Sequence, residues 1–302
     1  MQISDTLRPL AEFQKDINSQ FGEDGIVDEI LNRLSPAVSL DKWCVEFGAW
    51  DGVYLSNTCN LIRNRDYRAV LVEGDRAKYQ DLCRNLPSDS VVKICRFVTF
   101  DGESTLDRIL RETPIPNDFD FLSIDIDGCD YFIFDSLKAY KPKVVCVEFN
   151  PTIPNEVEFV QAKDFSVKQG ASPRSLAVLA ASKGYTLAAV THCNLILVRD
   201  DLKEMVVGAE SPTLESLRDD RDIKTFLFCG FDGTLLSNRR YLAMPWHGVK
   251  LDLSRMQLLP RYLRRFGSDY NALQKFAFSL LLLFRFGRFA RDKRARLSSE
   301  EG

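Results

Sequence analysis

Acidic residues and a glycine-bearing turn follow two apolar stretches near the start of this 302-residue sequence. The first stretch ends in Glu46-Phe47-Gly48 and continues through Ala49 to Asp51, and the second ends at Glu73. Glycine lets a ligand approach the backbone closely, and carboxylates accept hydrogen bonds from hydroxyl and ammonium groups. An acidic turn does not suit a phosphate. We therefore expect a nucleoside ligand with a cationic end, held by Glu46, Gly48, Ala49 and Asp51, with Glu73 on the ribose hydroxyls.

A second acidic group follows two later apolar stretches. Asp125 and Asp127 end one of them, and Glu148 and Asn150 end the next. If the strand stays extended, alternate residues point to the same side, so Asp125 and Asp127 would need a proton, a cation or hydrogen bonds to relieve their repulsion. Asp127, Glu148 and Asn150 offer the oxygen ligands that Mg²⁺ prefers. Without a metal, the same groups would cap turns and orient a substrate hydroxyl.

The reactive groups of such a site would be a base and a methyl donor. S-adenosylmethionine, a cationic sulfonium, fits the acidic turn, and Asp125 lies close enough in the predicted sheet to contact it. Methyl transfer then needs a residue that removes the acceptor's proton. His192, between two later strands, and Asp127 are both candidates for that base, and Asp127 could act directly or by holding a metal.

Alternating strands and helices position these residues. Apolar runs that are covered on both faces predict a mostly parallel sheet within an α/β domain. The last two runs are separated by only three residues, which predicts an antiparallel hairpin at the edge of the sheet. The expected strands are 42–48, 69–73, 91–97, 120–125, 144–149, 185–190 and 194–198. The expected helices are 24–34, 59–65, 78–86, 104–111, 131–139 and 173–183.

Charge divides the chain unevenly. Residues 251–302 carry a net charge of +6, which leaves −9 for residues 1–250. We predict three parts: a cofactor-binding domain over 1–200, a covering subdomain over 201–250 and a basic helical tail over 251–302. Residues 258–296 hold an apolar block between basic clusters, which suits either attachment to an anionic membrane surface or contact with a second subunit. The basic cluster that follows this block contains Arg288, Arg291, Lys293, Arg294 and Arg296.

The amino terminus carries charged residues where a signal peptide would be apolar, beginning with Asp5 and Arg8. We therefore expect a cytoplasmic protein that can also bind peripherally to the inner face of a membrane. We expect no nucleic-acid partner. The segment Phe231-Asp232-Gly233-Thr234 is similar to a phosphatase loop, but Gly230 replaces the nucleophilic aspartate, so a plain turn is predicted.

Four segments together resemble the FkbM-type methyltransferases. These are residues 19–25, 45–52 with 56–58, 72–75 and 123–128, and the resemblance spans about 19–200. It implies a Rossmann-like class I methyltransferase fold with seven strands, S-adenosylmethionine as cofactor, and O-methylation of a sugar or glycan-type acceptor. Where many relatives have Asp-Val-Glu-Gly, this chain has Asp125-Ile126-Asp127-Gly128. A metal-dependent glycosyltransferase that uses Asp125 and Asp127, and a non-catalytic module on the same fold, are the alternatives.

Overall fold

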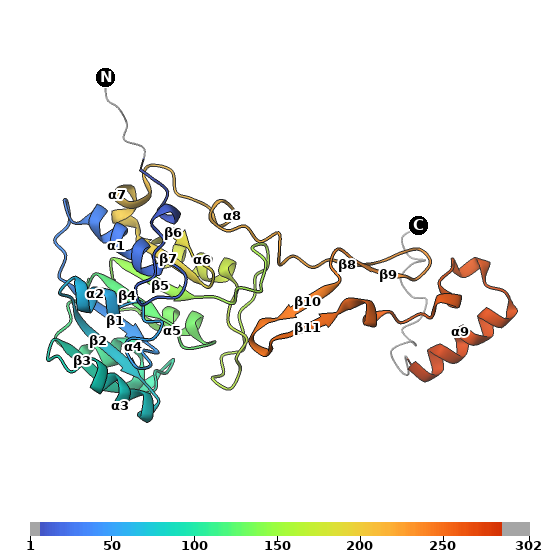
Figure 1. Ribbon diagram of the computed structural model, residues 1–302, viewed down its shortest axis with the longest axis horizontal. Coiled ribbons are helices and arrows are strands. Elements are labelled where there is room, and N and C mark those ends of the chain that lie inside the picture. The colour runs from blue at the N-terminus through green and yellow to red at the C-terminus, as the bar shows by residue number, and fades with distance from the viewer. Residues whose placement is uncertain (1–6, 286–302) are drawn as a thin grey trace, which may run out of the picture. The chain divides into compact units, whose positions relative to one another are not determined.

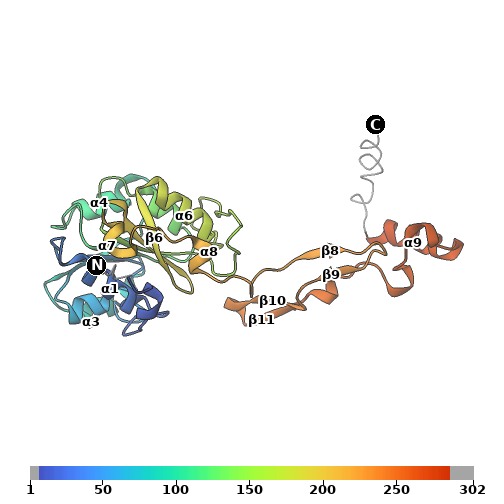
Figure 2. The same cartoon turned by 90° about the horizontal axis from the view of Figure 1, so that it is seen from above.

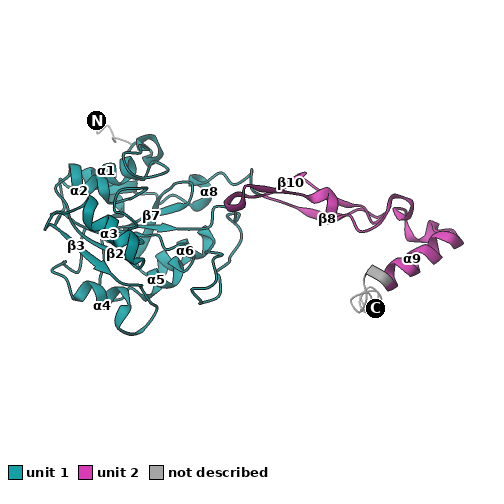
Figure 3. Cartoon of the chain, turned by 60° about the horizontal axis from the view of Figure 1, so that its bottom comes forward, with its two compact units in different colours: residues 1–223 teal, residues 224–302 magenta. Residues whose placement is uncertain are grey.

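A computed structural model describes residues 7–285 of the chain. The chain forms two compact units, Met1–Ile223 and Lys224–Gly302 (Figure 3). The first unit is larger than the domain that we predicted over residues 1–200, because the helices that follow residue 200 pack against its sheet.

A seven-stranded sheet forms the centre of the first unit. The strand order is β3-β2-β1-β4-β5-β7-β6, and β7 is antiparallel to both of its neighbours while the other strands run parallel (Figure 1). The fold class predicted from the sequence is confirmed, including the hairpin at the sheet edge. The strands are β1 Trp43–Phe47, β2 Arg68–Glu73, β3 Val91–Cys95, β4 Phe121–Ile124, β5 Val144–Glu148, β6 Tyr185–Val190 and β7 Asn194–Arg199.

Helices cover both faces of this sheet (Figure 2). One face packs against α1 Glu23–Leu34, α2 Cys59–Asn64, α3 Arg76–Asn85 and α7 Lys203–Val207. The other packs against α4 Leu106–Arg111, α5 Asp130–Ser136, α6 Pro173–Ser182 and α8 Leu214–Leu217. Because both faces are buried, the central strands are apolar throughout rather than alternating, which is why their sequence runs are continuous.

Local chemistry sets where these helices begin. The Asp75 carboxylate accepts hydrogen bonds from the backbone N–H groups of Ala77 and Lys78 and caps α3. Ser172 caps α6 in the same way, with Pro173 at the first helical position. Predicted and observed helices and strands agree to within two or three residues, since apolar runs and caps indicate elements more reliably than their exact ends.

The second unit contains two hairpins and a helix. The hairpins pair β8 Leu227–Cys229 with β9 Leu235–Ser237, and β10 Tyr241–Met244 with β11 Val249–Asp252. The turn predicted at Phe231–Thr234 is confirmed, because Asp232 accepts hydrogen bonds from the N–H and hydroxyl of Thr234 between β8 and β9. The helical extension predicted for the tail is seen as α9 Ala272–Arg285. Within residues 7–285, no helix is long and apolar enough to cross a membrane.

Candidate active site at the carboxyl ends of the strands

The predicted site residues gather at one edge of the sheet, where β1, β2, β4 and β5 end; we call it the carboxyl edge. The order of the strands reverses here, since β1 pairs with β2 on one side and β4 on the other. Crevices at such a reversal are the usual ligand sites of open α/β sheets. The turn after β1 and the loop after β4 therefore form the two walls of the site.

Gly48 brings these two walls into contact. Its φ is +76°, and a Cβ built on it would lie 1.7 Å from the backbone carbonyl oxygen of Asp125. The N–H groups of Gly48 and Ala49 both bond to the carbonyl of Val72 in β2, at 3.1 and 3.2 Å. Only glycine fits at this position. Gly48, which was predicted to form the turn, therefore also sets the spacing between the ends of β1, β2 and β4.

Glu46 acts on the site through a neighbouring loop. Its carboxylate is buried and accepts hydrogen bonds from the Ser56 hydroxyl at 2.6 Å, the Thr58 hydroxyl at 2.7 Å and the Asn57 N–H at 2.8 Å. Burial raises the pKa of Glu46, and these three donors partly oppose that rise. The cofactor contact predicted for this residue remains a prediction, but its oxygens are already engaged in ordering residues 56–58.

Asp51 and Glu73 shape the cofactor end of the site. Asp51 accepts hydrogen bonds from the N–H groups of Val53 and Tyr54 and so fixes the turn. The Glu73 carboxylate accepts the Trp50 N–H at 2.8 Å with one oxygen and the Asp75 N–H at 2.7 Å with the other. Each oxygen of Glu73 keeps a further lone pair. This carboxylate can therefore still accept hydrogen bonds from ribose hydroxyls.

An exposed aromatic ring beside Glu73 was not singled out from the sequence. Phe97 is 73% exposed, and its ring lies where a Cβ on Gly74 would be, at 2.5 Å. A flat ring held over the backbone next to the predicted ribose contact is suited to stack on an adenine base. The signal for Phe97 in the sequence is weak, because this residue is only the last apolar residue of the predicted strand 91–97.

An unpaired acceptor lies in the same region. Asp24 is buried, and one of its oxygens accepts three backbone N–H groups, those of Ile17, Asn18 and Ser19. The other oxygen has no hydrogen-bond partner among the described residues, and the charge of Asp24 contributes to the raised pKa of Glu46. Buried acceptors need donors. An orphaned carboxylate oxygen near the β1 strand end, the close-fitting Gly48 turn and the spare lone pairs of Glu73 together fit S-adenosylmethionine.

Three carboxylates meet after β4 and β5. Oxygens of Asp125, Asp130 and Glu148 all lie within 4.8 Å of one another. Asp130 accepts the N–H groups of Ile126 and Gly128, each at 2.9 Å, while Asp125 and Glu148 hydrogen-bond to each other. Burial, followed by mutual repulsion, raises the pKa values of Asp125 and Glu148. Such a pair is suited to share a proton, and to accept or release one.

Asp127, which was also proposed for this cluster, lies outside it. Strand β4 ends at Ile124 and Asp127 has a φ of +55°, so the extended geometry that we expected to align Asp125 with Asp127 is not formed. Asp127 is exposed, and its charge contributes to the raised pKa values of Asp125 and Glu148. It remains close enough to act on them electrostatically.

The predicted metal ligands are only partly brought together. Glu148 belongs to the cluster, whereas the Asn150 side chain accepts the N–H and hydroxyl of Thr152 and donates to the carbonyl of Gln169. Asp130 completes the cluster and was not assigned as a ligand from the sequence, because its position at the start of α5 indicates a helix terminus. Its spacing of five residues from Asp125 was the available signal.

His192 lies with the amino-terminal segment. Its exposed ring packs on Phe21, with centroids 4.7 Å apart, and both line a pocket of ≈ 460 Å³ with residues 14–16, 20 and 22. Glu23 joins that segment to the same loop by accepting the Thr191 hydroxyl at 2.6 Å and the Asn194 amide at 3.0 Å. The Phe149 N–H after β5 bonds to the carbonyl of Cys193 at 2.7 Å. His192 therefore lies at the carboxyl edge, and its role as a base remains a prediction.

Comparison with known proteins agrees with this site. Residues 102–180, which include the carboxylate cluster, match the methyltransferase FkbM domain. No curated protein matches the chain. Among solved structures, a putative O-methyltransferase from Klebsiella pneumoniae shares 15% identity at a TM-score of 0.37, covering 59% of this chain and 90% of its own.

An O-methyltransferase of tomaymycin synthesis from Streptomyces achromogenes, crystallised with S-adenosylmethionine, shares 18% identity at a TM-score of 0.38 and covers 57% of this chain and 79% of its own. At these TM-scores the likeness of the two structures to this chain is limited. Neither the glycosyltransferase nor the non-catalytic alternative is favoured. The chain is an S-adenosylmethionine-dependent methyltransferase, and its residues 102–180 match the methyltransferase FkbM domain.

Proposed function

We propose that this enzyme methylates a hydroxyl group of a sugar or glycan-type acceptor. The observation that carries the proposal is the hydrogen-bonded pair of Asp125 and Glu148 at the wall opposite the Gly48 turn. A sugar hydroxyl can donate a hydrogen bond to such a pair, which can then take its proton. The sugar class itself is supported by the resemblance to FkbM-type enzymes.

The chain's own residues would orient the donor and remove one proton. S-adenosylmethionine, when bound, supplies a methyl group on a positively charged sulfur. The Gly48 turn and Glu73 hold it at the ends of β1 and β2. Asp125 accepts the proton from the acceptor hydroxyl, and Glu148 retains the proton that the pair already shares. Asp127 and His192 are the other candidates for the base. Replacing each of the three residues and comparing the loss of methyl-transfer rate shows which of them acts as the base.

A divalent cation is the second form of this proposal. Asp125, Asp130 and Glu148 bring their oxygens close enough to hold Mg²⁺. This set differs from the ligands predicted from the sequence, which were Asp127, Glu148 and Asn150. These carboxylates would then bind the metal instead of sharing a proton. If dialysis against a chelator abolishes methyl transfer and Mg²⁺ restores it, the metal form is correct. Unchanged activity after dialysis supports Asp125 as the base.

Methyl transfer from labelled S-adenosylmethionine to a panel of sugars and phenols tests the proposal. Asp125→Asn should lower the rate of transfer by about 10²- to 10⁴-fold, the usual contribution of a general base, while calorimetry shows S-adenosylhomocysteine still bound. Asp89→Asn, an exposed carboxylate on the loop before β3, is the matched control and should leave the rate unchanged. Transfer to phenols and not to sugars would refute the acceptor class. Full activity of Asp125→Asn would refute the base.

A further inference from the structure

The helix α9 carries an exposed apolar stripe. Leu273, Phe276, Leu280 and Leu283 are 79, 64, 37 and 70% exposed. Their spacings of three, four and three residues place them within an arc of about 80° on one side of the helix, at about 100° per residue. Large apolar side chains that share one exposed helix face usually mark a contact with another surface.

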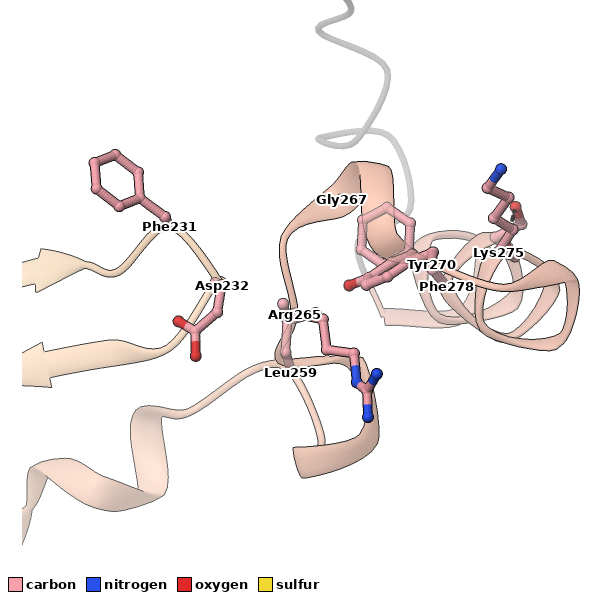
Figure 4. A pocket seen from close by; sticks show the side chains of 10 residues that line it. Phe231, Asp232, Leu259, Arg265, Gly267, Tyr270, Lys275 and Phe278 are labelled. Carbon is pink, nitrogen blue, oxygen red and sulfur yellow. Dashed lines mark hydrogen bonds between the residues drawn. The ribbon is translucent and has the colours of Figure 1, made fainter.

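The other side of α9 faces its own unit. Phe278 packs edge-on against Tyr270, with ring centroids 5.7 Å apart (Figure 4). Lys275, Phe278 and Ser279 line a pocket of ≈ 400 Å³ together with the tip of the β8–β9 hairpin at Phe231–Gly233. The helix is therefore held by one side, and within the described part of the second unit the apolar stripe is left facing solvent.

The sequence that carries this stripe is rich in positive charge. Residues 253–285 contain six Lys and Arg residues and a single acidic residue, Asp269. Over the whole second unit, residues 224–302, the formal net charge is +9, against −12 for residues 1–223. The basic residues are Arg255, Arg261, Arg264, Arg265, Lys275 and Arg285. The cluster predicted from Arg288 to Arg296 lies outside the described residues.

We propose that α9 binds the surface of an anionic lipid bilayer, with its apolar stripe inserted at the boundary between headgroups and acyl chains. Its 14 residues extend about 21 Å, shorter than the roughly 30 Å of a hydrocarbon core. The helix would consequently lie in the plane of the membrane. This surface belongs to the second unit, whereas the carboxyl edge belongs to the first, and the proposal does not depend on which acceptor the enzyme methylates.

Charge favours a membrane over a second copy of the chain as the partner. In a symmetric dimer, the stripes of two copies would meet and bring the same basic residues of both copies together. These like charges would repel across the interface. An anionic lipid surface instead attracts each of them, and the attraction extends about one Debye length into solution. The apolar stripe could bind either partner, but the basic residues favour only a partner that is negatively charged. An anionic membrane therefore fits both features of α9.

Flotation of the full-length chain with vesicles tests the proposal. Phosphatidylcholine vesicles containing about 30% phosphatidylglycerol should bind it, and neutral phosphatidylcholine vesicles should not. The double variant Leu273→Gln/Leu283→Gln should lower the partition coefficient at least about tenfold, because both side chains insert. Val178→Gln, which removes a 58%-exposed apolar side chain from α6, is the matched control and should bind like the wild type.

Several results would overturn the proposal. Equal binding to neutral and anionic vesicles would exclude an electrostatic surface, and unchanged binding by the double variant would exclude the stripe. Analytical ultracentrifugation without lipid tests the alternative partner. If the wild type is a dimer that the double variant dissociates, and neither floats with vesicles, the stripe is a subunit interface. Circular dichroism and urea unfolding establish that the variants are folded.

Discussion

Replacing Gly48 by alanine tests whether close approach of the β1 turn to the β4 loop is what forms the site. The added Cβ would lie 1.7 Å from the carbonyl oxygen of Asp125, so the two loops must separate by about 1.3 Å to reach 3.0 Å. Gly102 offers a control for the backbone cost alone. Its φ is +73°, close to the +76° of Gly48, and a Cβ there meets nothing within 4 Å.

The two substitutions share one cost and differ in the other. Placing alanine in the left-handed region costs about 1–2 kcal/mol in both variants. Overpacking adds about 1–3 kcal/mol at Gly48 only. We therefore expect Gly102→Ala to lose about 1–2 kcal/mol of unfolding free energy and Gly48→Ala about 2–5 kcal/mol, measured by urea denaturation.

Cofactor affinity distinguishes a defect in the site from a loss of stability. The same separation moves the Asp125 loop away from the Gly48 turn, so the dissociation constant for S-adenosylhomocysteine should rise at least tenfold, about 1.4 kcal/mol, in Gly48→Ala. Gly102→Ala should bind like the wild type, as isothermal titration calorimetry would measure. If both variants unfold and bind alike, the loops are not held together as the structure indicates, and the reasoning fails.

Two further predictions concern buried charge. Lys143→Met should lower the unfolding free energy by about 3–5 kcal/mol, because it removes the positive charge that lies 3.0 Å from the fully buried Asp120 carboxylate and leaves that carboxylate with backbone N–H donors; a loss under about 1 kcal/mol in urea would contradict this. Glu148 and Asp125 have raised pKa values in the folded state, so the stability that their protonated forms contribute is present at acidic pH and lost as the pH rises through those values. The unfolding free energy of the wild type should therefore fall between about pH 5 and pH 9, and Glu148→Gln should flatten this slope; an unchanged slope would mean that the pair does not share a proton.

The sequence predicted the sheet well because its strands are buried on both faces. Short apolar runs such as Val144–Glu148 indicate buried parallel strands when helical segments separate them. Residues 201–250 were harder to interpret: β8 and β9 are three residues each, with side chains mostly exposed or half-buried. Such short hairpins do not require an apolar run, so periodicity gives little signal there.

The site was predicted less completely than the fold, for a reason that its carboxylates illustrate. The sequence placed Glu46 and Asp125 at strand ends, but it could not show that hydroxyls from residues 56 and 58 would engage the first, or that Asp130 would join the second. Hydrogen-bond partners and pKa values depend on contacts between segments far apart in the sequence. Asp127 shows the same limit, because β4 ends at Ile124 and Asp127 has a φ of +55°, so the strand alternation from which its direction was inferred does not extend to it.

The placement of buried charge explains why this sheet suits a cationic donor. Among the described residues, Lys143 is the only buried Lys or Arg, and it lies at the amino end of β5, opposite the site. Several buried or partly buried acids instead gather at the carboxyl edge, namely Glu23, Asp24, Glu46, Asp125, Asp130 and Glu148. Among the residues that the structure describes, no buried Lys or Arg offsets them there, so the edge attracts positive charge, and the pKa values of Asp125 and Glu148 are raised because the acids are held close together. A sulfonium ion would relieve this repulsion when it binds, and the neutral product left after methyl transfer would not. The same acids that bind the donor thus favour release of the product.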